Sequence, residues 1–181
     1  MAPSKTYCWR RIDFPGLEIL HLSRGANDIT ARATIIDAGD GQFALQAHWS
    51  LGPDWRSRSL ELTQETRDGV KTLRIKRGQR GWVVDGKVRP DLDACLEVDV
   101  SATPFCNGLA LHALGREPGE LTALYVDASD LSVQPSRQRY ERVGERTWRY
   151  VDLGVAKGFE AALNFDNDGI VERYEGLFER G

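Results

Sequence analysis

The fold is decided by an alternation that is clearest in residues 43–51, which read FALQAHWSL. The odd-numbered positions of this stretch are all apolar, whereas the even-numbered positions hold Ala, Gln, His and Ser. Because successive side chains of a β-strand point to opposite faces, a period of two predicts a strand with one apolar face and one wet face. The same alternation recurs at residues 73–76 and 159–165. These segments predict a sheet that buries one face.

Tight-turn signals separate the alternating segments. Asp-Gly occurs at residues 40–41, 68–69, 85–86 and 168–169. This pair suits the positive-φ positions of two-residue hairpin turns, so each instance is a predicted hairpin tip. We expect strands at residues 6–13, 17–24, 28–37, 42–51, 55–65, 71–79, 81–85, 95–101, 121–128, 132–142, 147–153, 158–166 and 170–175.

The segment from Pro104 to Leu114 differs, because it is rich in Leu and Ala. Thr103 is a candidate N-cap, Pro104 stands at the first helical position and Gly115 follows the segment. This pattern predicts one short helix, in which Gly108 costs roughly 1 kcal/mol relative to Ala. Since the other predicted elements are strands, the helix needs an apolar surface of the sheet to pack against.

So many strands in one sheet cannot stay flat, because right-handed twist curls a long sheet into a barrel or folds it into a sandwich. We therefore expect a mostly β protein in which residues 1–181 form one domain, with the helix at the mouth or on the concave face of the curl.

The net charge and the cysteine content of the chain limit the classes of partner and site that we expect. The formal net charge is −3 and the pI is about 5.7, which argues against nucleic acid or an anionic membrane as the main partner. The three cysteines are widely spaced, so neither a disulfide framework nor a zinc site is expected. No apolar run follows the first residues and no stretch is long enough to span a bilayer, so we expect a cytoplasmic protein.

Three charged residues fall on strand faces predicted to be apolar: Arg10, Glu18 and Arg58. Because a lone buried charge is costly, each is expected to have a partner. Arg10 and Glu18 flank the Pro15-Gly16 turn and can meet across a hairpin, whereas Arg58 needs another acceptor, such as Asp99 or a ligand. Two interpretations stay open: a structural ion pair with an arginine at the rim, or polar anchors inside an apolar cavity.

No catalytic or metal-binding constellation is present in the sequence. The three histidines lack metal-ligand spacing, and we find no G-x-S-x-G elbow, phosphate-binding glycine loop or dinucleotide fingerprint. Residues 166–169, DNDG, are similar to the start of a calcium loop, but their strand context favours a hairpin turn. We therefore expect no cofactor, no metal and no catalytic residues. Five tryptophans fit either a packed core or the lining of a lipid or sugar site.

Several stretches resemble a bacterial family of poorly known function that is described as putative glycolipid-binding. The similarity runs through most of the chain. The stretches that carry it are residues 9–10 (WR), 16–18 (GLE), 55–58 (WRSR), 95–100 (CLEVDV), 103–107 (TPFCN), 135–140 (PSRQRY), 148–150 (WRY), 159–163 (FEAAL), 168–171 (DGIV) and 176–178 (GLF).

This resemblance implies an open, unclosed β-barrel like that of bacterial lipoprotein-localisation factors, with a helix near the concave side. Those carriers hold acyl chains in the hollow of the half-barrel. The chain departs from the family pattern at residues 108–114, which read GLALHAL where the family usually has Thr-Leu-Pro-Ile-Arg-Arg-Leu. Two arginines that would suit a ligand head group are therefore missing.

The leading prediction is a non-catalytic protein that binds an amphipathic lipid or glycolipid in the hollow of the open barrel. Two alternatives belong to other classes. One is a hydrolase of small glycosides or esters, which needs two carboxylates about 5–9 Å apart at the barrel mouth. The other is a protein-interaction module with a packed core and an exposed apolar patch. The predicted lining residues are Trp49, Leu60, Phe105 and Leu109, and the predicted polar contacts are Arg10, Glu18, Arg58 and Asn107.

Overall fold

The computed structural model describes residues 4–39, 41–79 and 81–181, which form one continuous 15-stranded sheet and one α-helix. The strands of the first half are β1 (Ser4–Arg11), β2 (Gly16–Arg24), β3 (Ile29–Asp37), β4 (Phe43–Leu51), β5 (Ser57–Thr66), β6 (Gly69–Gly78), β7 (Gly81–Val84) and β8 (Lys87–Val88). The 3-10 helix η1 (Pro90–Leu92) then leads to β9 (Cys95–Val100) and to the helix α1 (Phe105–Ala113). The remaining strands are β10 (Gly119–Val126), β11 (Val133–Arg142), β12 (Thr147–Asp152), β13 (Glu160–Phe165), β14 (Val171–Tyr174) and β15 (Phe178–Arg180).

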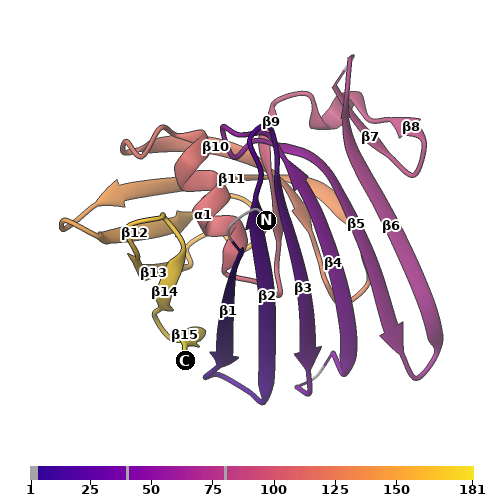
Figure 1. The fold of residues 1–181 in the computed structure, drawn as a ribbon, viewed down its shortest axis with the longest axis horizontal. Helices are drawn as coiled ribbons and strands as arrows, with labels where there is room; N and C mark the ends of the chain where they lie inside the picture. The colour runs from indigo at the N-terminus through magenta and orange to yellow at the C-terminus, as the bar shows by residue number, and fades with distance from the viewer. Residues whose placement is uncertain (1–3, 40, 80) are drawn as a thin grey trace.

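The sheet is not closed into a barrel. Its order is β8-β7-β6-β5-β4-β3-β2-β1-β15-β14-β13-β12-β11-β10-β9, so β8 and β9 are its two ends. The first and last strands of the chain join the two halves, because β1 pairs with β15 in the centre of this order. Neighbours are antiparallel except β9 and β10, which are parallel. In Figure 1 the orange strands β10 to β13 run across the direction of β1 to β6. The predicted mostly β fold, an open barrel made of one curled sheet, is confirmed.

Side chains link the end strand β9 to β6 and to the start of β5, where no strand ladder forms. The guanidinium groups of Arg56 and Arg77 donate to the Leu96 carbonyl of β9 at 3.2 and 2.7 Å. In return, the Glu97 carboxylate accepts a hydrogen bond from the backbone N–H of Ser57 in β5 at 3.1 Å. These bonds satisfy polar groups at the free edge of β9, which would otherwise be open to pairing with another chain.

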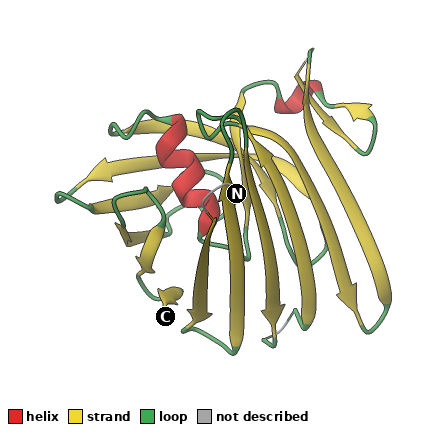
Figure 2. Ribbon diagram, in the orientation of Figure 1, coloured by secondary structure: helices red, strands yellow, loops and turns green. Residues whose placement is uncertain are grey.

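The concave face of the sheet and α1 together form the core. Every odd-numbered residue of β4 is buried, as its alternation predicts. Phe105 and Leu109 of α1 have no exposed surface, and the Phe105 ring meets the Trp49 ring of β4 edge-on, with 5.2 Å between their centroids. Figure 2 shows α1 among the strands, on the inner side of the curl. The helix therefore lies where the sequence places it, on the concave side.

The Asp-Gly turns lie at hairpin tips. Asp85 and Gly86 between β7 and β8 have φ of 46° and 80°, and Gly69 and Gly169 have φ of 127° and 80°. Asp40 of the remaining pair lies outside the described residues. The sequence missed two strands, β8 and β15, because segments of two and three residues are too short to show an alternation.

Gly108 has a steric role that helix propensity does not reveal. A Cβ atom at this position would lie 2.5 Å from the carbonyl oxygen of Gly169, in the turn between β13 and β14. Beside this contact, the His112 Nε2–H donates to the Asp168 carbonyl at 3.0 Å. The helix and the β13–β14 turn therefore approach closely because position 108 has no side chain.

We expect the Gly108→Ala variant to be less stable by about 1–3 kcal/mol, because an extra methyl group must displace packed backbone. The free energy of unfolding from urea titration, followed by tryptophan fluorescence, measures this change. Helix propensity alone favours Ala by roughly 1 kcal/mol, so a variant that is stabilised by that amount would contradict the close approach.

Candidate functional site

The predicted lining residues of the hollow form the core. Trp49, Leu60, Phe105 and Leu109 are at most 2% exposed. Because α1 and the inward side chains of the long strands occupy the concave face, the interior of the curl is packed rather than hollow. In the structure, the four predicted lining residues are therefore part of the packed core.

Arg10 lies on the outer face of the sheet, so its predicted place on the inner face is wrong. The buried residues of β1 are Tyr7 and Trp9, which have the opposite parity to Arg10. The Arg10 guanidinium pairs with Glu179 of the neighbouring strand β15 at 2.7 Å, and it does not meet Glu18. Two large aromatic rings outweigh the smaller apolar residues on the other face, and they decide which face turns inward.

Arg58 is also exposed, because β5 is irregular at its start. Ser50 of β4 pairs with Ser59, whereas the next residue, Leu51, pairs with Ser57. The extra residue in β5 is a bulge, which breaks the alternation and turns Arg58 away from the face that Leu60 shares. The prediction that Arg58 contributes an inner polar contact is therefore wrong.

Glu18 is buried on the inner face of β2, as its alternation with Leu20 and Leu22 predicts. It is 1% exposed, and its Oε1 accepts a hydrogen bond from the Thr103 hydroxyl at 2.8 Å. Its Oε2 has no hydrogen-bond partner among the described residues. Burial raises the pKa of the Glu18 carboxyl to about 8, so this side chain carries a proton at neutral pH.

A pocket of about 220 Å³ opens beside Thr103, at the N-terminal end of α1. We call it the carboxylate pocket. Strand β9, strand β10, the end of β12 and the strands β14 and β15 contribute to it, together with the loop before β13. Its polar lining residues, apart from the tyrosines, are Asp99, Ser101, Thr103, Asn107 and Asp152, and its aromatic ones are Tyr125, Tyr150, Phe159, Tyr174 and Phe178.

A chain of hydrogen bonds runs along the base of the carboxylate pocket. The Asn107 amide donates to the Tyr140 hydroxyl at 3.1 Å, and this hydroxyl donates to the Gln138 Oε1 at 3.3 Å. The Gln138 Nε2 then donates to Asp99 Oδ2 at 2.5 Å. Asn107 is thus the one predicted polar contact that lines this pocket, and the chain fixes the orientation of the Asp99 carboxyl.

The second carboxyl of the pocket belongs to Asp152. It is 4% exposed and accepts hydrogen bonds from the Tyr150 hydroxyl at 3.2 Å and the Gly154 N–H at 2.7 Å. Asp152 is the cross-strand partner of Gln138, so one amide side chain separates the two aspartates. Burial raises the pKa of Asp99 to about 6, and the nearby charge of Asp152 adds to this effect.

Aromatic rings form the wall of the carboxylate pocket. The ring centroids of Tyr150, Phe159 and Tyr174 are 6.1–6.3 Å apart, and Phe178 lies 6.2 Å from Tyr174. Phe159 is 37% exposed, so it stands at the rim of the pocket. The pocket therefore combines flat apolar surfaces with a few fixed polar groups, which is typical of small-molecule sites.

The sequence contains a signal for this site that our prediction did not use, namely polar and aromatic residues that share a strand face. Gln138 and Tyr140 are two residues apart in one predicted strand, and Tyr150 and Asp152 are two residues apart in the next. Each pair therefore shares a strand face, and the register places Tyr140 opposite Tyr150. A search for polar side chains on inner faces, extended to the C-terminal half, identifies these four residues.

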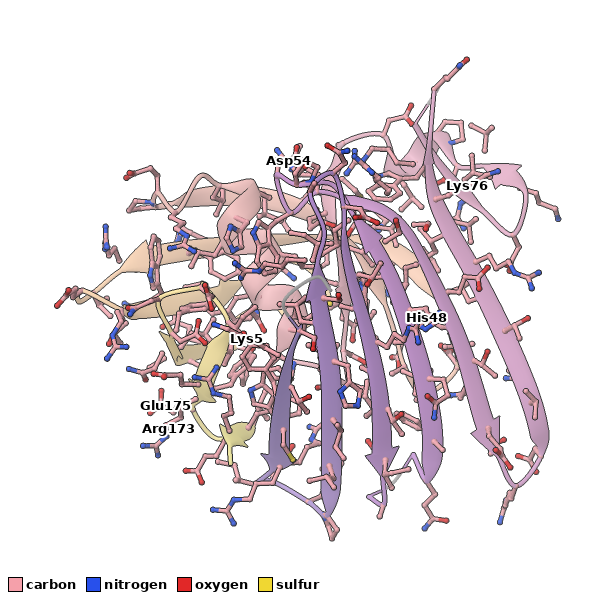
Figure 3. All side chains as sticks on the ribbon, viewed as in Figure 1. Lys5, His48, Asp54, Lys76, Arg173 and Glu175 are labelled. Atoms are coloured by element: carbon pink, nitrogen blue, oxygen red, sulfur yellow. The ribbon has the colours of Figure 1, made fainter. Side chains whose placement is uncertain are left out.

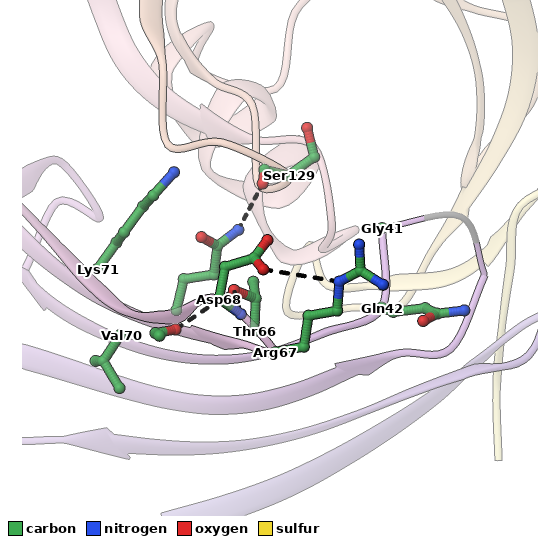
Figure 4. Close-up of a pocket in the computed structure, with 10 residues that line it drawn as sticks. Gly41, Gln42, Thr66, Arg67, Asp68, Val70, Lys71 and Ser129 are labelled. Atoms are coloured by element: carbon green, nitrogen blue, oxygen red, sulfur yellow. Dashed lines mark hydrogen bonds and ion pairs between the residues drawn. The ribbon is translucent and has the colours of Figure 1, made fainter.

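A larger pocket of about 440 Å³ lies between the tip of the β5–β6 hairpin and the loop at Ser129 (Figure 4). The Gln64 amide bridges the two parts by donating to the Ser129 carbonyl at 2.8 Å. At the tip of the β5–β6 hairpin, the Arg67 Nε lies 3.7 Å from the Asp68 Oδ1, and both side chains are almost fully exposed. Because no aromatic ring lines this larger pocket, whereas five aromatic residues line the carboxylate pocket, we prefer the carboxylate pocket as the candidate site.

The histidines are surface or packing residues in the structure. His48 points outward from β4 (Figure 3), whereas His112 stacks on Trp55 with 4.4 Å between the ring centroids. No group of three His, Cys, Asp or Glu residues is placed to hold a metal ion in the described ranges. In the DNDG turn, Asp166 accepts the N–H groups of Asp168 and Ile170, which supports the hairpin interpretation.

An apolar surface lies on the outside of the sheet. Leu17, Ile19 and Ile36 are 39–45% exposed, and Leu17 is the cross-strand partner of Ile36. The packed interior and this patch are what a protein-interaction module was expected to have. The carboxylate pocket is not part of that expectation.

Comparisons with known proteins agree with the resemblance found in the sequence. A family described as putative glycolipid-binding matches residues 6–180. A crystal structure of a DUF1089 family protein from Pseudomonas aeruginosa is 29% identical, with a TM-score of 0.74 over 91% of this chain and 92% of that chain. No curated protein matches the chain. Within the described residues, the helices are too short or too polar to cross a membrane.

The raised pKa of Glu18 gives a pH-dependent prediction. Between the ordinary carboxyl value of about 4.5 and about 8, the unfolded chain releases a proton that the folded chain keeps, so rising pH lowers the stability of the native protein. In Glu18→Gln this loss is absent. The free energy of unfolding of Glu18→Gln should therefore increase relative to the native protein by up to about 1.4 kcal/mol per pH unit.

Urea titrations at pH 5, 6, 7 and 8 measure this difference. Gln keeps an oxygen that accepts the Thr103 hydroxyl, so the variant preserves that hydrogen bond. A difference that stays constant over this range would show that the Glu18 carboxyl titrates normally in the folded protein.

Proposed function

The chain belongs to the putative glycolipid-binding family. We propose that it binds the sugar head group of an amphipathic glycolipid in the carboxylate pocket and does not change the ligand chemically. One observation carries this proposal: the pocket joins a wall of aromatic rings to a base of fixed carboxyl and amide groups. The packed core supports the same site, since Trp49, Leu60, Phe105 and Leu109 are covered there, whereas the carboxylate pocket is open at the N-terminal end of α1.

The chemistry of a sugar ring matches the pocket lining. A sugar presents C–H groups on its faces, which pack against flat aromatic rings such as Tyr174 and Phe159. Its hydroxyl groups lie around the edge of the ring and need acceptors and donors. The carboxyl groups of Asp99 and Asp152 accept from hydroxyls, and the Thr103 hydroxyl and Asn107 amide are further polar contacts.

The pocket volume limits which part of a glycolipid enters. At about 220 Å³ it is smaller than the roughly 300–1,000 Å³ of pockets for drug-sized ligands, so it accommodates a single sugar-sized group. The acyl chain then lies outside, against apolar residues of the rim. Val155 and Phe159 are 39% and 37% exposed there. This arrangement replaces the sequence expectation that acyl chains fill the hollow.

A second candidate function is hydrolysis of a glycoside or ester, and the pair of carboxyl groups favours it. Glycosidases use one carboxyl that keeps its proton and a second that is ionised. Asp99 has a raised pKa of about 6 and lies in the same pocket as Asp152. Asp152, however, already accepts hydrogen bonds from the Tyr150 hydroxyl and the Gly154 N–H, so its carboxyl group stabilises the end of β12.

Hydrolysis and binding predict different results with 4-nitrophenyl glycosides and esters. A hydrolase releases 4-nitrophenol, and the release falls to background in Asp99→Asn, which removes the proton donor. A protein that only binds gives background release in both forms while its NMR spectrum still responds to the sugar. We expect the second result.

Binding itself is tested with octyl glucoside below its micelle concentration. The amide NMR signals that shift should come from residues 99–107 and 150–178, which surround the carboxylate pocket. Phe159→Ala should weaken binding about tenfold, since it removes a rim ring that packs on the sugar. Shifts confined to other residues would contradict the site.

Ile36→Ala is the matched control, because Ile36 is similarly exposed but lies on the outer face of the sheet. Its dissociation constant should equal that of the native protein. Equal weakening in both variants would show that the detergent binds apolar surface without using the pocket.

A further inference from the structure

The carboxylate pocket has an unbalanced charge. Apart from the tyrosines, the only titratable side chains in its lining are those of Asp99 and Asp152, and both are acidic. Within the described residues, neither forms an ion pair with Lys, Arg or His. In the DNDG turn, by contrast, Asp166 meets Arg180 at 2.8 Å, and Asp168 meets Lys5 at 2.5 Å.

This imbalance costs free energy in the empty pocket. Taking a carboxylate out of water is unfavourable unless a counter-charge replaces the lost solvation, and two carboxylates in one site repel each other. The Thr103 hydroxyl, which also lines the pocket, is hydrogen-bonded to the buried carboxyl of Glu18 and offers no positive charge. A positive group in the pocket would offset both penalties.

The aromatic wall is suited to the same kind of group. The faces of Tyr and Phe rings are negative, so they attract a cation within about 6 Å of the ring centroid. Tyr150, Phe159 and Tyr174 all line the pocket, and they pack against one another with 6.1–6.3 Å between their ring centroids. Rings beside carboxylates are the arrangement that binds ammonium groups.

We propose that the head group bound in the carboxylate pocket carries an ammonium group, which lies between the carboxylates of Asp99 and Asp152 and the rings of Tyr150, Phe159 and Tyr174. This inference rests on the proposed function and specifies its ligand class: an amine-bearing glycolipid, such as one with an amino sugar. Phosphorylated or carboxylated head groups are excluded, because the pocket offers them two negative charges and no basic side chain.

The test compares three probes that share one octyl chain and one sugar ring. They are octyl glucoside, the same compound with an amino group in place of the 2-hydroxyl, and octyl glucuronide, which carries a carboxylate. Dissociation constants come from isothermal titration calorimetry at low salt, below the micelle concentrations. We expect the amino compound to bind at least tenfold more tightly than the neutral one, and the carboxylate compound not to bind.

Two variants test whether the preference for the amino compound depends on the carboxylate pocket. Asp99→Asn removes one charge but keeps an oxygen that accepts the Gln138 amide, and Asp152→Asn keeps an oxygen for the Gly154 N–H. In each, the ratio of the dissociation constants of the neutral and amino compounds should fall to about twofold or less. Asp68→Asn is the control, because this carboxylate lies at an exposed hairpin tip and its removal should leave the preference intact.

The outcomes separate the inference from the proposed function. Equal binding of the amino and neutral compounds overturns the ammonium site and leaves glycolipid binding in place. Binding of none of the three probes, together with no response to tetramethylammonium chloride, overturns both. If tetramethylammonium chloride alone shifts the NMR signals of Tyr150 and Tyr174 while no sugar binds, the ammonium site is supported and the glycolipid proposal fails. A preference that survives in both pocket variants places the cation elsewhere and overturns the inference.

Discussion

The structure depends on burying the one apolar face of a continuous 15-stranded sheet. A sheet of this length curls because of its twist, but side chains of the sheet alone do not fill the space that it encloses. Helix α1 fills it: Phe105 meets Trp49 of β4, and Gly108 lets the helix approach the turn at Gly169. The twist of the strands therefore determines the curvature of the sheet, and the burial of α1 determines the packed state of the interior.

The shortness of α1 explains where a pocket remains. Nine helical residues extend over about 14 Å, which covers only part of the concave face. Beyond the N-terminal end of the helix, the carboxylate pocket opens among β9, β12 and β14. Polar and amphipathic side chains occupy this end, with the hydrogen-bonded chain from Asn107 to Asp99 as its base. The candidate site is thus the part of the concave face that the helix does not reach.

The electrostatics of this end are unfavourable for folding. Glu18 and Asp99 have raised pKa values because burial penalises their ionised forms, so each lowers stability as the pH rises. Apolar residues of similar volume would pack there without this penalty. The same side chains that weaken the fold give the pocket its binding chemistry, which is a common relation between stability and function.

The sequence by itself determined the strand alternation, the Asp-Gly turns, the single helix and the inward position of Glu18, because each depends on residues near one another in the chain. It did not determine the outward positions of Arg10 and Arg58. The first followed from the larger area of Tyr7 and Trp9, and the second from a bulge opposite Leu51. Only the tertiary structure decided that Trp49, Leu60, Phe105 and Leu109 form a packed core. The same holds for the carboxylate pocket, because strand register and the length of the helix, rather than local pattern, bring Asp99, Asp152 and the tyrosines together.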